Sequence, residues 1–322
     1  MEKTVKMQDN SATDESVAGF FNGCLFRGPS GSTGYFMTKA YKEIADDVLN
    51  LAVRPDDVWV TGFPRSGTTL TQELVWLVAT ECDYETASKI PLMSRYMFLE
   101  GQVSVNFMKT KLKGEISEAV FTLDDINSAP SPRFIKTHTA FSLLPSNLLD
   151  TTKVVYIARD PRDVAVSNYQ YSRKLFKYTG DFKTFWNIFV SDLHIFCPIL
   201  AHVKEAWELR RHHNMMFIFY EDLLKDIPLY IKRVADFLNK KLTDDQITKL
   251  TEHLNIKNFR KNESVNPTWI DKSGDPNAEG FIRKGGAGGW RQYFDEEMTV
   301  QAQRWMRDHL TGSNLRFPEH TS

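Results

Sequence analysis

A strand pattern, a glycine-bearing turn and a helical pattern follow one another without interruption. This unit limits the folds open to the chain more than any other feature. Residues 58–61 (Val-Trp-Val-Thr) are β-branched or aromatic, as in a buried strand. The turn over 62–67 begins and ends with glycine, and apolar residues at helical spacing follow Thr68 and Thr69. A helix N-terminus behind such a turn presents several backbone N–H groups to an anion. We therefore predict a phosphate-binding loop here, in preference to an ordinary Gly-Pro-Ser connection.

The position of the positive charge indicates which phosphate this loop holds. A nucleoside-triphosphate loop carries Lys directly after its second glycine. In this chain Thr68 stands there, and the cation of the loop is Arg65, two residues before Gly67. An ATP-using P-loop kinase is therefore the less favoured enzyme hypothesis.

The rest of the chain repeats the alternation of strand and helix patterns. Residues 133–136, 153–157 and 215–219 are further buried-strand patterns. Between the last two, an apolar stripe with steps of three and four predicts helical core packing that Pro198 kinks or divides. These alternations predict an α/β fold with a parallel sheet flanked by helices on both faces. We expect residues 1–16, which are polar, to form a mobile N-terminal tail, and residues 17–322 to form a single domain.

Composition excludes several classes of protein. The net charge of −1 lacks the basic excess of a nucleic-acid binder. The three cysteines are scattered without the spacing of a metal site or of a disulfide framework. No apolar stretch approaches the length of a membrane span, and no signal core opens the chain, so we expect a cytoplasmic protein.

Further motifs with the chemistry of an anion site follow the loop in chain order. Each places polar or charged side chains at the end of a predicted strand or in a glycine-rich segment, where an α/β sheet binds ligands. They are Lys136-Thr137-His138, Arg159-Asp160-Pro161 with Ser167 in the next helix, Tyr220 after the last strand, and Arg283-Lys284-Gly285 within a run of glycines.

In order and spacing, these motifs resemble the cytosolic sulfotransferases that use 3'-phosphoadenosine 5'-phosphosulfate (PAPS). The resemblance covers residues 58–290 and implies a P-loop-like sheet, PAPS as co-substrate, 3',5'-bisphosphate nucleotide (PAP) as product, and no metal. It implies that a sulfuryl group moves to the hydroxyl of a small apolar acceptor, such as a phenol, steroid or retinoid. The implied catalytic residues are His138 as general base, Lys136 and Arg65. The implied cofactor-binding residues are Arg65, Ser66, Gly67, Thr68, Thr69, Arg159, Ser167, Tyr220, Arg283, Lys284 and Gly285, with the backbone N–H groups of residues 66–69 on the 5'-phosphate. The implied substrate-binding residues are Phe98, Phe141 and Tyr171.

The chain departs from the family pattern at Arg65, where relatives have Lys, at Leu70, where they have Trp, and at Ile256, where many have an aromatic residue. We expect Arg65→Lys to keep activity if the loop needs only charge. The aliphatic side chains of Leu70 and Ile256 are expected to hold adenine by van der Waals contact instead of aromatic stacking. Residues 291–300 lack the family's dimerisation pattern, so a family-type dimer is not expected. Two alternatives stay open: a PAPS- or hydrophobic-ligand-binding protein without turnover, and an enzyme that eliminates the sulfate it has transferred.

Overall fold

The computed structural model describes residues 3–8, 23–29, 33–104, 120–266, 279–283 and 285–319. Its centre is a five-stranded sheet in the order β5-β6-β4-β7-β8, in which every pairing is parallel. The phosphate-loop strand β4 lies in the middle, so the loop leaves the sheet between two neighbours. The strands are β4 (Val58–Thr61), β5 (Met97–Phe98), β6 (Phe134–Thr137), β7 (Lys153–Ala158) and β8 (Met215–Phe219).

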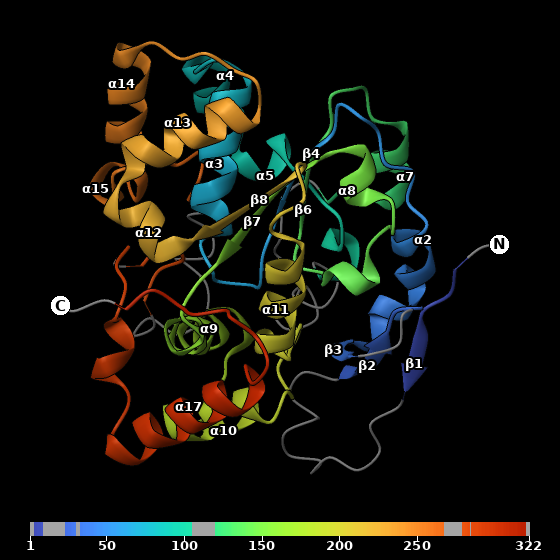
Figure 1. Cartoon of the computed structure of the whole chain (residues 1–322), viewed down its shortest axis with the longest axis vertical. Helices are drawn as coiled ribbons and strands as arrows, with labels where there is room; N and C mark the ends of the chain where they lie inside the picture. Colours follow the sequence, from blue (N-terminus) through green and yellow to red (C-terminus); the bar gives the residue numbers. More distant parts are fainter. Residues whose placement is uncertain are drawn as a thin grey trace.

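Helices cover both faces of this sheet (Figure 1). Trp59, Val154 and Tyr156 point into one core, whereas Val60 and Val155 point into the other, as the alternation of side chains along a strand requires. The predicted parallel sheet flanked by helices is therefore confirmed. The first core is closed by α9 (Pro161–Phe176), α10 (Phe182–Val190), α11 (Ile199–Leu209) and α17 (Glu296–His309), and the second by α3 (Thr68–Ala79), α13 (Ile227–Phe237) and α14 (Asp244–Leu254).

Shorter helices connect these elements. The α-helices are α2 (Ala45–Leu49), α4 (Tyr84–Lys89), α5 (Leu92–Arg95), α7 (Leu123–Ser128), α8 (Leu148–Thr151), α12 (Tyr220–Lys225) and α15 (Ile256–Phe259), and the 3-10 turns are η1 (Lys39–Glu43), η2 (Phe141–Leu143) and η3 (Gly289–Gln292).

The long apolar stripe is divided, as predicted. Helix α10 ends at Val190, and α11 begins at Ile199 directly after Pro198. Proline fixes its own φ and lacks an N–H, so it fits the residue before a helix better than the interior of one. Helix α10 begins where the Asp181 side chain accepts the N–H of Thr184 at 2.8 Å.

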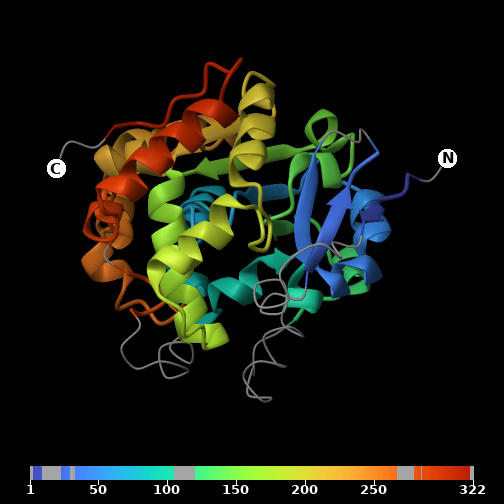
Figure 2. The same cartoon turned by 90° about the horizontal axis from the view of Figure 1, so that it is seen from below.

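A second, antiparallel sheet near the N-terminus was not predicted. It consists of β1 (Lys6–Gln8), β2 (Gly23–Arg27) and β3 (Gly34–Thr38), and it lies at the side of the molecule away from α17 (Figure 2). The expectation of a mobile tail over 1–16 is therefore wrong for residues 6–8, which pair with β2. The side chains of β1 are exposed, so no hydrophobic pattern announces this strand, and backbone pairing holds it.

In the part of the chain that the structure describes, no helix combines the length and the apolar character needed to cross a membrane.

Candidate active site

The phosphate-binding loop leaves β4 and enters α3 through Gly67, which has φ +105°. A Cβ at this position would lie 2.5 Å from the ring of Tyr220, so only glycine allows the loop and this tyrosine to approach so closely. The first amides of α3 have no acceptor within the helix and are available to an anion. Ser66 differs from expectation, because its N–H donates to the carbonyl of Phe63 at 3.1 Å.

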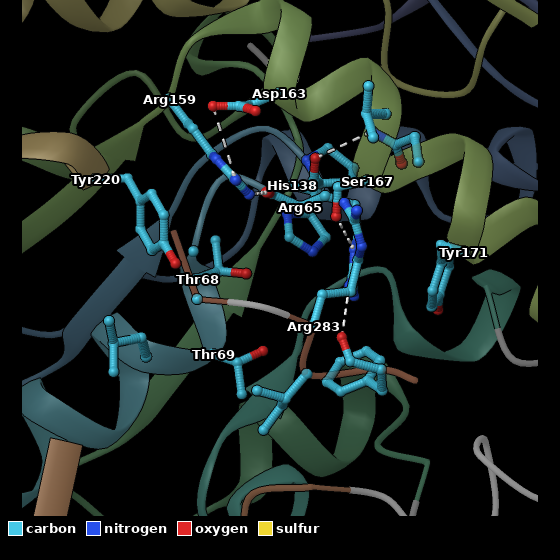
Figure 3. A pocket seen from close by; sticks show the side chains of 18 of the residues that line it. Arg65, Thr68, Thr69, His138, Arg159, Asp163, Ser167, Tyr171, Tyr220 and Arg283 are labelled. Atoms are coloured by element: carbon cyan, nitrogen blue, oxygen red, sulfur yellow. Dashed lines mark hydrogen bonds and ion pairs between the residues drawn. The ribbon is translucent and has the colours of Figure 1, made fainter. Parts of the chain in front are cut away.

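A cavity of about 600 Å³ brings most of the predicted site residues together (Figure 3). Arg159 and Tyr220 lie on one side and Tyr171 on the other, with Arg65 and His138 between them. The predicted residues that line the cavity are Arg65, Gly67, Thr68, Thr69, Phe98, Lys136, His138, Arg159, Ser167, Tyr171, Tyr220, Arg283 and Gly285.

Two predicted residues do not line the cavity, and a third lies outside the described residues. Ser66 is fully buried within the loop. Phe141 is not a lining residue, because its ring packs 6.1 Å from that of Tyr156 in the core. Lys284 lies outside the described residues.

Arg65 connects the loop to two distant segments. Its Nε donates to Ser167 Oγ at 3.2 Å, and its Nη2 donates to the carbonyl of Phe281 at 2.6 Å. The guanidinium lies 4.8 Å from the ring centroid of Tyr171 and 4.7 Å from that of Phe281. Burial lowers its pKa to about 10, which leaves it charged at neutral pH. A guanidinium makes both hydrogen bonds at once because its donors form a fork.

Arg159 forms the opposite wall and connects the loop to the glycine-rich segment. It lies 4.6 Å from the ring centroid of Tyr220, and it donates to the carbonyls of Arg65 at 3.3 Å and of Gly286 at 2.9 Å. Arg283 also lines the cavity and forms an ion pair with Glu279.

Asp163 is a positioning residue that sequence reasoning missed. Its carboxylate accepts the backbone N–H of Gly288 at 2.6 Å and of Trp290 at 2.9 Å, and it lies 4.0 Å from Arg159. The carboxylate therefore holds the glycine-rich segment against α9. The signal in the sequence was its place four residues after Arg159, across the N-terminus of α9, which Asp160 caps.

Aliphatic side chains line one part of the cavity, as the departures predicted. Leu70, Leu254 and Ile256 all line it. Gly285 has φ +63°, and a Cβ there would lie 2.3 Å from Ile256, so glycine is required for this contact.

One buried polar atom of the cavity wall fits an anionic ligand. Arg159 lines the cavity, and its Nε is buried without a hydrogen-bond partner among the described residues. Buried donors are costly unless an acceptor reaches them, and phosphate oxygens are strong acceptors. Within the described ranges, no cluster of three His, Cys, Asp or Glu side chains could hold a metal ion.

His138 follows β6 and lies nearly buried against the loop. Its Nδ1 is 2.6 Å from the carbonyl oxygen of Gly62. A carbonyl only accepts, so Nδ1 carries the proton and Nε2 keeps a lone pair. Burial, with the nearby charge of Lys136, holds the pKa of this imidazole well below its usual 6.5. The ring is neutral at pH 7 and can accept a proton at Nε2.

Aromatic rings surround the imidazole of His138. Phe98 and Phe196 meet the imidazole edge-on at 5.6 and 5.7 Å. The ammonium of Lys136 lies 4.4 Å from the ring centroid of Phe98. The imidazole and its neighbouring cation are therefore held in a largely apolar wall.

Glu100 is a second residue that sequence reasoning missed. It is buried and accepts hydrogen bonds from the backbone N–H of His138 and, at 2.8 Å, from Thr137 Oγ1. Burial raises its pKa to about 7. No charge pattern in the sequence identifies it, because it follows an apolar run far from His138 in the chain.

Comparison with known proteins now decides the family. The family model of the sulfotransferase domain matches residues 55–314. The chain belongs to the sulfotransferase family. The sulfotransferase is 32% identical to sulfotransferase 1A1 of Rattus norvegicus, over 88% of this chain and 94% of that protein. It is 31% identical to luciferin sulfotransferase of Photinus pyralis, over 85% of this chain and 77% of that protein.

Solved structures agree with the assignment of this chain to the sulfotransferase family. The crystal structure of retinol dehydratase in complex with androsterone and PAP is 39% identical, with a TM-score of 0.87 and 99% of each chain covered. A second structure of retinol dehydratase, with retinol and PAP, has the same identity and TM-score. The predicted family, enzyme class and fold are thus confirmed, and the kinase hypothesis has no support.

Proposed function

We propose that this sulfotransferase transfers the sulfuryl group of PAPS to the hydroxyl of a small, mostly apolar alcohol, with His138 as general base. The observation that carries the proposal is that the Nε2 lone pair belongs to a side chain lining the same cavity as the phosphate loop and Arg159. A proton acceptor and an anion site therefore share one enclosed space.

On the nucleotide side, we assign the start of α3 to the 5'-phosphate and Arg159, Ser167 and Arg283 to the 3'-phosphate. The unpartnered Arg159 Nε supports this assignment, because a phosphate oxygen would give it the acceptor it lacks. The PAP bound in retinol dehydratase supports the nucleotide class. Leu70 and Ile256 would cover the adenine ring of the nucleotide by aliphatic contact.

On the acceptor side, the cavity is mainly apolar. Its lining there includes Met37, Phe98, Val103, Phe176, Ile195 and Phe196. Such a wall favours a hydrocarbon skeleton over a sugar or a peptide. Androsterone and retinol, the molecules in the two retinol dehydratase structures, are both alcohols of this kind. We therefore place sterols and polyene alcohols ahead of simple phenols as acceptors.

The proposed chemistry assigns one task to each side chain. PAPS, when bound, would supply the activated sulfuryl group and a phosphate leaving group. His138 would take the hydroxyl proton of the acceptor at Nε2. Lys136 and Arg65 would stabilise the negative charge that develops near the loop, since fixed charges in a dry site need no reorganisation. The rigid loop and helix would keep acceptor and donor in line.

A second candidate reaction is dehydration of the acceptor. It is favoured by the 39% identity with retinol dehydratase across 99% of each chain. In this reaction the sulfate ester of an allylic alcohol would lose sulfate from carbon and a proton from a neighbouring carbon. The products would be an additional double bond and free sulfate.

The test measures transfer of the ³⁵S-labelled sulfuryl group from PAPS to a panel of phenols, steroids and retinoids. The products are separated and identified by mass spectrometry. A labelled ester supports transfer alone. A dehydrated product with labelled inorganic sulfate supports the second candidate. PAP binding without transfer to any acceptor would indicate a binding protein without turnover.

A further inference from the structure

Buried hydrogen bonds run from Tyr156 through His202 to the main chain of His138, the proposed base. Tyr156 Oη on β7 is 2.7 Å from His202 Nδ1 on α11. His202 Nε2 is 3.0 Å from the carbonyl oxygen of His138. The imidazole of His138 makes a separate hydrogen bond to the Gly62 carbonyl of the phosphate loop. Two of these groups, Tyr156 and His202, do not line the cavity and have no part in the chemistry proposed above.

The chemistry of the acceptors sets the direction of every bond. The His138 carbonyl only accepts, so His202 carries its proton on Nε2. Burial lowers the pKa of His202 to about 4, so the ring is neutral and its Nδ1 is a lone pair. Tyr156 must therefore donate its O–H to that nitrogen. The carbonyl of His138 thus fixes the tautomer of His202, and the carbonyl of Gly62 fixes that of His138.

Hydrogen bonds hold the main chain of His138 from both sides. Its N–H donates to the carboxylate of Glu100, and its carbonyl accepts from His202. The exposed fraction is 1% for His202 and 0% for Tyr156, so water cannot replace either bond. The ring of Phe63 in the loop also meets His202 edge-on at 5.7 Å. A shift of His202 would therefore move both the base and the loop.

We propose that His202, set by Tyr156, is a positioning residue that aims Nε2 of His138 at the acceptor hydroxyl. This inference rests on the proposed role of His138 as the base. Neither His202 nor Tyr156 lines the cavity, so they should affect the rate of the chemical step and not the binding of nucleotide or acceptor. A misplacement of a reacting group by about 1 Å can cost about a hundredfold in rate.

The first experiment compares substitutions that keep or remove the donor to His138. His202→Leu removes it, and we expect kcat to fall about tenfold or more while acceptor KM and PAP Kd change less than about threefold. His202→Gln places an amide N–H near the position of Nε2 and should recover most of kcat. Tyr156→Phe removes the hydroxyl that donates to His202 Nδ1 and should lower kcat by a smaller factor.

Tyr35→Phe is the matched control. The ring of Tyr35 also packs edge-on against His202, at 6.1 Å, but its hydroxyl donates to Glu205 at 2.7 Å, outside the chain of bonds to His138. It removes a buried hydroxyl next to the same imidazole, and kcat should stay within about twofold of the unmodified protein. An equal loss of kcat in Tyr35→Phe and Tyr156→Phe would overturn the proposal in favour of a general packing effect.

The second experiment observes the tautomers directly and needs no activity. Long-range ¹H–¹⁵N spectra of histidine-labelled protein should show His138 protonated at Nδ1 and His202 protonated at Nε2. The opposite tautomer in either ring would overturn the proposal, even if His202→Leu fails to fold. An inactive His138→Ala with normal kcat in His202→Leu would refute the positioning role alone. Full turnover in His138→Ala would refute the proposed function instead.

Discussion

The Nδ1 atom of His138 lies 2.6 Å from the carbonyl oxygen of Gly62, the first residue of the phosphate loop. The loop that begins α3 therefore also orients the side chain proposed as the base. Because the Nδ1–H group donates to this carbonyl, the basic nitrogen Nε2 is directed away from the loop strand. One hydrogen bond therefore joins the predicted phosphate loop to the proposed base.

Removing the base should stop turnover without preventing nucleotide binding. We expect His138→Ala to lower kcat about a hundredfold or more, the range for a lost general base, with PAP affinity nearly unchanged. His138→Asn is the sharper variant, because its amide can still donate to Gly62 but has no basic nitrogen. Steady-state transfer and calorimetry with PAP measure both effects. Near-normal turnover in either variant would contradict the assignment.

The pH profile should have its acidic limb below pH 6.5. Activity requires neutral His138, and burial holds the pKa of that imidazole well below 6.5, so activity is lost only as the pH falls through this lowered value. The charged or titratable neighbours are Lys136, Arg65, His202 and Glu100. kcat/KM measured from acid to neutral pH checks this. An inflection near pH 7 would instead indicate Glu100, whose pKa burial raises to about 7.

The 3'-phosphate should contribute much of the nucleotide affinity. We expect PAP to bind about tenfold to a hundredfold more tightly than adenosine 5'-phosphate, as hydrogen bonds to charged groups allow. Arg159→Gln should narrow this difference. Arg162→Gln is the control, since Arg162 pairs with Asp160 at 2.6 Å and does not line the cavity. Calorimetry with both nucleotides on all three proteins decides, and equal affinities in the unmodified protein would exclude the pocket.

The structure changes the expected outcome of Arg65→Lys. Sequence reasoning favoured retained activity, but Arg65 donates to Ser167 and Phe281 at the same time. A lysine carries the charge but cannot span both acceptors with a planar fork. We now expect Arg65→Lys to lose about tenfold in single-turnover rate and Arg65→Met to lose more, with smaller changes in PAP affinity. Unchanged rates in Arg65→Lys would show that only the charge matters.

The buried ion pair between Arg133 and Asp57 should dominate local stability. Both side chains are fully buried, and the guanidinium donates to the carboxylate at 2.7 and 2.6 Å. Arg133→Met leaves an uncompensated buried carboxylate, so the free energy of unfolding should fall by about 3–5 kcal/mol. Lys89→Ala is the control, because its pair with Glu85 is exposed and should contribute at most about 0.5 kcal/mol. Urea denaturation of both variants measures the difference.

Several parts of this protein could be predicted from the sequence, because they depend on residues that are neighbours in the chain. The strands β4 and β8 occupy the predicted residues, and Pro198 separates two helices as expected, because side-chain period and proline geometry act locally. The strand-end positions of His138 and Arg159 also followed from the chain, since parallel strands end at one edge of the sheet.

The tertiary structure sets how distant groups meet. It directed Phe141 into the core instead of the cavity, and it paired the polar strand β1 with β2. It also brought Glu100 and His202 to the two sides of the His138 backbone and gave Arg65 a second acceptor at Phe281. These contacts span many residues and depend on which face an element presents and on how the layers stack. No local pattern encodes them, because a buried hydrogen bond forms only where packing excludes water and leaves one available partner.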